Sequence, residues 1–142
     1  MAIVYFDSSA LVKLLVDEPG SDLAAELWDG CDAALSSRLA YPEVRAAIAA
    51  AQRNHALDDV GVVQALRSWK EFWAAIRPVE LTGAVERNAG ELAHRHALRG
   101  ADAVHLASAL TVPRPELVVA VWDRRLHAGV VAEHLTVAPV AP

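Results

Sequence analysis

Short runs of consecutive apolar residues, bounded by polar sequence and separated by helical stretches, constrain the fold of this chain more than any other feature. The clearest runs are AIVYF at residues 2–6 and ELVVAVW at residues 116–122. Neither run alternates polar and apolar side chains, as a strand with one solvated face would. Strands that are apolar on both faces and joined by helices predict a parallel sheet covered on both sides, and therefore an α/β fold.

The remaining sequence supplies the other elements that such a sheet needs. Apolar residues recur at helical spacing in several segments, and Gly or Pro residues separate most of these segments. We predict strands at residues 2–6, 33–37, 77–81, 116–122 and 135–137. We predict helices over about residues 9–16, 21–28, 42–51, 58–75, 82–98 and 101–110, with Gly100 ending the fifth of them, and a short helix from Arg124.

Length and composition limit the classes of protein that this chain can belong to. With 142 residues and no linker-like segment, residues 1–142 are expected to form a single domain. No apolar run approaches the length of about 20 residues that spans a bilayer, and the N-terminus lacks the pattern of a signal peptide. We therefore expect a cytoplasmic protein with no membrane association. The net charge of −5 argues against broad coating of nucleic acid, but it is compatible with a nuclease that has an acidic pocket.

Four acidic residues are predicted to meet at one edge of the sheet. Asp7 and Asp123 follow two of the predicted strands, while Glu43 and Asp102 lie in the first turns of two helices. Taken singly, each acid is explained by helix capping or by the helix dipole. Taken together, four converging carboxylates would repel one another and destabilise the fold unless a cation neutralised them.

The chemical nature of these side chains indicates which cation would bind. Carboxylate oxygens in an open site favour Mg²⁺ or Mn²⁺, whereas zinc would favour His and Cys ligands, which do not cluster here. A metal held in this way can activate a water for in-line attack on a phosphodiester and neutralise the leaving oxygen. The pattern therefore favours phosphoryl-transfer chemistry.

Four segments of the chain resemble the PIN-domain ribonucleases, and specifically the VapC-type toxins of bacterial toxin–antitoxin pairs. The segments are VYFDSSALVKLLVDEPGS at the start, SSRLAYPEV around Glu43, LRGADAVHLASAL around Asp102 and VWDRRL around Asp123. Their order and spacing carry the resemblance, which covers essentially the whole chain. It implies a three-layer α/β/α domain and Mg²⁺- or Mn²⁺-dependent endonuclease activity on RNA. It also implies a VapB-type antitoxin as partner and assembly as a homodimer, or as a hetero-oligomer with the antitoxin.

The resemblance also assigns roles to individual residues. Asp7, Glu43, Asp102 and Asp123 match the acidic metal-binding residues of the family, and Ser8 or Ser9 matches its hydroxyl position after the first acid. Members often carry Thr or Ser where this chain has Val121, which puts a hydrogen bond near Asp123 in question. A PIN-like module that binds a partner without cleaving RNA is therefore the alternative to the enzyme.

Several other residues have both a functional and a purely structural interpretation. Arg99 and Arg124 neighbour assigned acids and are candidates for contacts to RNA phosphates. His105 is interpreted as a hydrogen-bonded core histidine and Cys31 as a spectator thiol, while His94 and His96 are expected at the surface. Trp69, Phe72 and Trp73 are expected in the core, with an interface as the alternative, and Trp122 either walls the site or is buried.

Overall fold

Five parallel strands form the centre of the computed structural model, which describes residues 2–142. Their order across the sheet is β3-β2-β1-β4-β5, and β1 pairs with β2 on one side and with β4 on the other. The strands are β1 (Ile3–Phe6), β2 (Ala33–Ser37), β3 (Arg77–Val79), β4 (Leu117–Ala120) and β5 (Thr136–Ala138). The predicted α/β class with a parallel sheet is confirmed.

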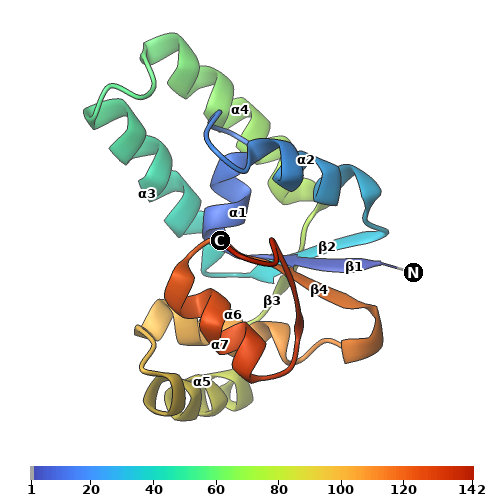
Figure 1. Ribbon diagram of the computed structural model, residues 1–142. Coiled ribbons are helices and arrows are strands. Elements are labelled where there is room, and N and C mark those ends of the chain that lie inside the picture. The colour runs from blue at the N-terminus through green and yellow to red at the C-terminus, as the bar shows by residue number, and fades with distance from the viewer. Residues whose placement is uncertain (1) are drawn as a thin grey trace.

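Helices cover both faces of the sheet and complete three layers (Figure 1). One face carries α1 (Ser8–Lys13), α2 (Ser21–Gly30), α3 (Ala40–Arg53) and α4 (Asp59–Ala75). The other face carries α5 (Gly83–His96), α6 (Gly100–Ala109) and α7 (Arg124–Ala132), and a 3-10 turn at Arg114–Glu116 leads into β4. No helix within residues 2–142 is long and apolar enough to cross a bilayer.

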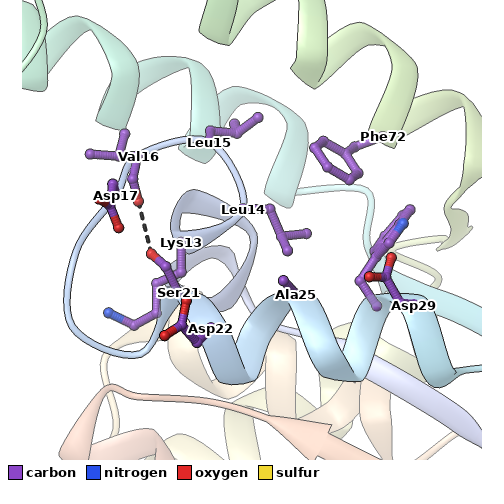
Figure 2. A pocket seen from close by; sticks show the side chains of 11 residues that line it. Lys13, Leu14, Leu15, Val16, Asp17, Ser21, Asp22, Ala25, Asp29 and Phe72 are labelled. Atoms are coloured by element: carbon purple, nitrogen blue, oxygen red, sulfur yellow. Dashed lines mark hydrogen bonds between the residues drawn. The ribbon is translucent and has the colours of Figure 1, made fainter.

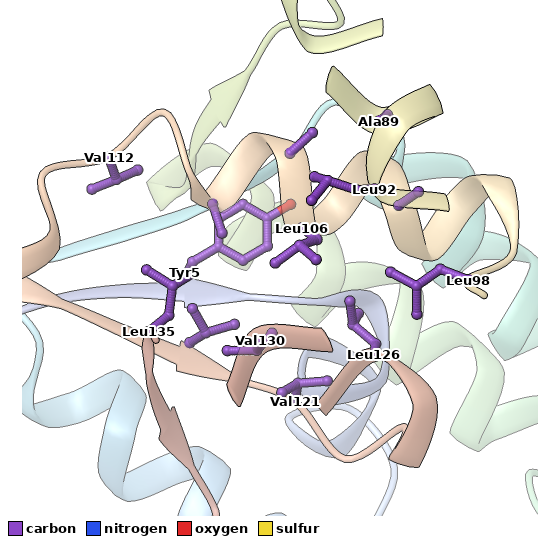
Figure 3. Close-up of a cluster of buried hydrophobic side chains, with 14 of the residues drawn as sticks. Tyr5, Ala89, Leu92, Leu98, Leu106, Val112, Val121, Leu126, Val130 and Leu135 are labelled. Carbon is purple, nitrogen blue, oxygen red and sulfur yellow. The ribbon is translucent and has the colours of Figure 1, made fainter. Parts of the chain in front are cut away.

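The central strand β1 supplies side chains to both of the cores that these layers create. Val4 and Phe6 point into the cluster beneath α1–α4, which also contains Trp69. Tyr5 points the other way, into the cluster beneath α5–α7 that contains Leu106 and the other side chains shown in Figure 3. Successive side chains of a strand face opposite sides of the sheet, and here both sides are covered. This arrangement explains why the AIVYF run does not alternate polar and apolar residues.

The structure differs from the predicted element boundaries at two places next to the acids. The fifth predicted helix ends at His96 rather than near Leu98, because Ala97 adopts the left-handed conformation (φ 52°) and its N–H donates to the carbonyl of Ala93. Gly100 therefore begins α6 instead of ending α5. Strand β4 ends at Ala120, and the N–H of Trp122 donates to the Ser9 hydroxyl of α1. Asp123 is thus presented on a short connection rather than directly on the strand.

Two glycines provide a matched test of how tightly the loop after α1 is packed. Gly20 has φ +96°, and a Cβ atom at this position would lie 2.6 Å from Nε1 of Trp122. Gly20→Ala is expected to lower the free energy of unfolding by about 1–3 kcal/mol through backbone strain and overpacking. Gly90 lies inside α5, and a Cβ atom added there would meet open space, so Gly90→Ala is expected to raise stability by about 0.5–1 kcal/mol. Urea unfolding monitored by circular dichroism measures both, and equal effects would contradict the packing described.

Candidate active site

The first acid, Asp7, is buried at the point where β1 passes into α1. Its side chain is 4% exposed and caps α1 by accepting a hydrogen bond from the N–H of Ala10 at 2.9 Å. The Ser9 hydroxyl donates to the same oxygen, Oδ1, at 2.7 Å. Among the described residues no donor contacts Oδ2. Asp7 therefore acts as a helix cap through one oxygen, and its other oxygen has no hydrogen-bond donor among the described residues.

Glu43, in the first turn of α3, is held in the same one-sided way. The Ser8 hydroxyl donates to Glu43 Oε1 at 2.7 Å, and Nε2 of His105 lies 2.6 Å from the same oxygen. His105 comes from α6 and is itself buried, and its Nδ1 lies 2.8 Å from the hydroxyl of Tyr5. Glu43 therefore joins α1, α3 and α6 through Oε1 alone, and within residues 2–142 no hydrogen bond reaches Oε2.

The remaining two acids are linked by an arginine. Asp123 caps α7 through Oδ1, which accepts from the N–H of Leu126 at 2.9 Å. The guanidinium of Arg99 lies 3.4 Å from Asp102 Oδ2 and 3.5 Å from Asp123 Oδ2. The Arg99 side chain is 69% exposed, so these pairs are held weakly by comparison with the buried contacts of Asp7. The exposed guanidinium of Arg99 thus partly neutralises two of the four carboxylates.

The electrostatics of the site show that these side chains lie close enough to affect one another. Burial, reinforced by the charge of Asp123, raises the pKa of Asp7 to about 6, although His105 and the hydrogen bonds from Ser9 and Ala10 oppose the shift. Burial and the charge of Asp123 also raise the pKa of Asp102. Burial acts in the same direction on Glu43, but hydrogen bonds from His105 and Ser8 outweigh it and lower the pKa of that group. Charge therefore couples Asp123 to Asp7 and to Asp102, while Glu43 is linked to this group through His105.

The donor set at this edge fits a hard divalent cation in its chemistry, since every candidate ligand is a carboxylate oxygen. In the present conformation, no three Asp, Glu, His or Cys side chains of residues 2–142 surround a common ion position. The contacts already described account for part of this, because Arg99 engages the Oδ2 atoms of Asp102 and Asp123.

Several further residues have structural surroundings that bear on their roles. Val121 is fully buried in the cluster beneath α5–α7, so its side chain serves the core and supplies no hydrogen bond to Asp123. Lys13 lies 5.2 Å from the ring centroid of the half-buried Trp122. Arg124 is exposed at the start of α7, and Arg38 is paired with Glu80.

The sequence interpretation of the histidines was partly wrong. His94 is exposed, as predicted, but His96 is half-buried and lies 2.8 Å from Glu133 Oε1, just after α7. His105 is a buried, hydrogen-bonded histidine, as predicted, yet it also contacts an assigned acid, which the apolar sequence around it did not reveal. Its position three residues after Asp102, on the same helix face, was the available signal.

A cavity on the side of the sheet that α1–α4 cover is lined by none of the four acids. Its volume is about 510 Å³, and side chains of α1, α2 and α4 and of the loop after α1 line it, among them Lys13, Leu14, Trp28 and Phe72 (Figure 2). Phe72 is half-buried because it faces this cavity, whereas Trp69 is buried as predicted.

Comparison with known proteins identifies the family to which this α/β fold with its four acids belongs. The family model of the PIN domain matches residues 4–112. The chain is 69% identical over 139 residues to Ribonuclease VapC45 of Mycobacterium tuberculosis, covering 98% of this chain and 96% of that protein. Ribonuclease VapC46 of the same species is 32% identical, with 100% of this chain and 99% of that protein covered. The chain therefore belongs to the PIN-domain family, as a member of its VapC type.

Solved structures agree with this assignment at the level of the fold. A toxin-antitoxin complex from Klebsiella pneumoniae aligns with a TM-score of 0.63 at 19% identity, covering 92% of each chain. Mycobacterium tuberculosis VapC20, described as a Sarcin-Ricin loop cleaving toxin, aligns with a TM-score of 0.64 at 18% identity, covering 88% of this chain and 93% of that chain. The three-layer arrangement of this chain is thus the one found in toxins of this kind.

The raised pKa of Asp7 predicts a pH-dependent cost to stability. Because the folded-state pKa of about 6 exceeds the ordinary value of 3.8, the folded protein retains a proton that the unfolded chain has released between these pH values. The resulting stabilisation is complete below about pH 4 and is lost as the pH rises through about 6. Asp7→Asn keeps a capping oxygen and removes the charge. In EDTA at pH 7 the free energy of unfolding of this variant is expected to be on the order of 2 kcal/mol higher than that of the wild type.

Urea unfolding of both proteins at several pH values measures this difference. The gain should shrink toward zero near pH 4, where the Asp7 carboxyl of the wild type is already protonated. A difference that is the same at every pH would show that the effect comes from packing and not from the charge.

Proposed function

We propose that this chain is a Mg²⁺- or Mn²⁺-dependent endoribonuclease that acts as the toxin of a toxin–antitoxin pair. The observation that carries the proposal is the electrostatic coupling of Asp123 to Asp7 and to Asp102, with Glu43 held by His105, which also acts on Asp7 and Asp102. The names of the relatives, Ribonuclease VapC45 and Ribonuclease VapC46, support RNA as the substrate.

In this proposal each acid has a defined task. Asp7 and Glu43 offer Oδ2 and Oε2 as ligands, because their other oxygens are already held by Ser9 and by Ser8 with His105. Asp102 joins these two acids as the third ligand, and Asp123 completes or flanks the set. When bound, the ion supplies a water of lowered pKa and neutralises charge on the leaving oxygen. The fixed carboxylates would orient the ion and its water for in-line attack on a phosphodiester.

The proposed biological setting is neutralisation by a VapB-type antitoxin, together with assembly as a homodimer or as a hetero-oligomer with the antitoxin. The structural neighbours include a toxin-antitoxin complex and a FitAB structure bound to a DNA fragment, both proteins with which this chain shares its fold. A cognate antitoxin fits this setting because an unregulated ribonuclease would degrade RNA of the cell that makes it.

The metal requirement is tested directly on purified full-length protein. RNA cleavage is expected to stop in excess EDTA and to return when Mg²⁺ or Mn²⁺ is added, because no other cation at the site activates water. Asp7→Asn is expected to lower the rate by more than about 100-fold, since changes to residues that merely support metal ligands already cost about 10- to 100-fold. Asp29→Asn, an exposed acid on α2, is the matched control and should cleave normally.

Total RNA with sequencing of the cleavage ends is the appropriate assay, because it does not require the substrate to be known. The expected ends carry a 5′-phosphate and a 3′-hydroxyl. Cleavage that persists in EDTA would refute the metal requirement, and Mn²⁺ binding without any cleavage would favour the non-hydrolytic binding module instead.

Arg99 is proposed to exchange its carboxylate partners for an RNA phosphate when the ion binds. Arg99→Gln removes a competitor of the ion, so half-maximal activation is expected at a Mn²⁺ concentration up to about 5-fold lower, the equivalent of a weak surface ion pair. The same variant loses a phosphate contact, so the KM for RNA should rise and its salt dependence should weaken. Arg124→Gln is the control, since Arg124 pairs with none of the acids among the described residues and should affect RNA binding only. A parallel loss in both measurements for Arg99→Gln would contradict the exchange.

A further inference from the structure

Tyr5 and His105 form a buried polar connection that runs from the middle of the sheet to the acidic edge. Tyr5 is 0% exposed on the central strand, and its side chain lies among Leu106, Val130 and other apolar residues (Figure 3). Its hydroxyl lies 2.8 Å from Nδ1 of His105, and the two rings meet edge-on with centroids 5.9 Å apart. The other ring nitrogen of His105 lies 2.6 Å from Glu43 Oε1.

We infer that Tyr5 and His105 are positioning residues that fix the carboxylate of Glu43, so that its free oxygen is aimed at the metal site. The inference deepens the proposed metal-dependent function and rests on it. The site already offers Ser8 as one donor to Oε1, and His105 supplies a second donor from a different helix. Two donors from α1 and α6 on one oxygen restrict rotation of the carboxylate about its own axis. Tyr5 in turn restricts rotation of the imidazole ring.

The direction of the hydrogen bonds follows from the chemistry of the three groups. An ionised carboxylate only accepts hydrogen bonds, so the 2.6 Å contact requires a proton on Nε2 of His105. In a neutral ring Nδ1 is then an acceptor, and the Tyr5 hydroxyl donates to it. In a charged ring Tyr5 accepts instead, but Nε2–H still donates to Glu43. The position of this one proton is therefore the same in either state of the ring.

The burial of these groups indicates that they do more than fill space. A phenylalanine and an apolar residue would fill the same volume without placing a hydroxyl and an imidazole in an apolar core, where polar groups are costly unless they are fully hydrogen-bonded. Outer groups that orient metal-binding side chains commonly affect metal affinity or activity by about 10- to 100-fold when removed. A purely structural pair would instead affect folding and leave Glu43 uncoupled.

The test uses full-length protein and the binding of Mn²⁺ alone, measured by isothermal titration calorimetry. Tyr5→Phe deletes one oxygen, and it is expected to weaken Mn²⁺ binding by about 10-fold while the KM for RNA stays within about 2-fold. Tyr41→Phe is the matched control, because Tyr41 is partly exposed on α3 and its hydroxyl contacts only Arg45 among the described hydrogen-bond partners. His105→Gln, which can keep a donor, should retain more Mn²⁺ affinity than His105→Leu.

A double-mutant cycle separates positioning from general destabilisation. In a Glu43→Gln background, Tyr5→Phe should weaken Mn²⁺ binding by less than about 2-fold, because the group that it positions is gone. The same loss in both backgrounds would overturn the inference. If the wild type binds no Mn²⁺ at all, the proposed metal function fails.

Nuclear magnetic resonance of the wild type tests the hydrogen bond between His105 and Glu43 independently of metal binding. This test does not require that any variant fold. In ¹⁵N-histidine-labelled wild type, His105 is expected to carry its proton on Nε2, with a hydrogen-bonded proton signal that Glu43→Gln shifts. An Nε2 without a proton would overturn the inference whatever the outcome of the metal measurements.

Discussion

The placement of partly buried carboxylates at the ends of parallel strands is the physical constraint on which the rest of this structure depends. Neighbouring parallel strands end at the same edge of the sheet, so an acid that follows β1 lies near an acid that follows β4. Asp7 and Asp123 are so placed, and helices α3 and α6 add Glu43 and Asp102. The raised pKa of Asp7 reflects chiefly the burial of its carboxylate, and the charge of Asp123 adds to it. The electrostatic cost of burying carboxylates is therefore confined to the ends of β1 and β4 and the helix starts beside them.

The protein offsets this cost with hydrogen bonds that are distributed in a particular way. Asp7 and Glu43 receive all their described donors on a single oxygen, whereas Asp102 and Asp123 share the exposed guanidinium of Arg99. The first pair is thus held rigidly, and the second pair is neutralised by a group that can leave. Helix capping by Asp7 does not compete with the proposed metal binding, because capping occupies Oδ1 and the proposal assigns the ion to Oδ2.

The acids could be predicted from the sequence because each one follows a recognisable element. Asp7 and Asp123 come after apolar strands, and Glu43 opens a helix whose apolar face is plain, so topology alone brings them together. Topology does not say which side chains support them. His105 stands among apolar residues, and its contacts with Tyr5 and Glu43 depend on side-chain positions that only the packing of α6 against the sheet determines. The pairing of His96 with Glu133 could not be predicted from the sequence for the same reason, since the two residues belong to different helical segments.

The helix boundaries that were predicted wrongly illustrate a related limit. Gly100 is the typical residue for ending a helix, but the chain makes that turn at Ala97, whose left-handed backbone lets the buried Leu98 reach the core. Burial of Leu98 then leaves Arg99 in an extended conformation and starts α6 at Gly100. This turn places Arg99 beside Asp102 and Asp123, so a packing requirement in the core determines which cation faces the acids. The turn at Ala97–Arg99 thus connects the core beneath α5–α7 with the acids Asp102 and Asp123.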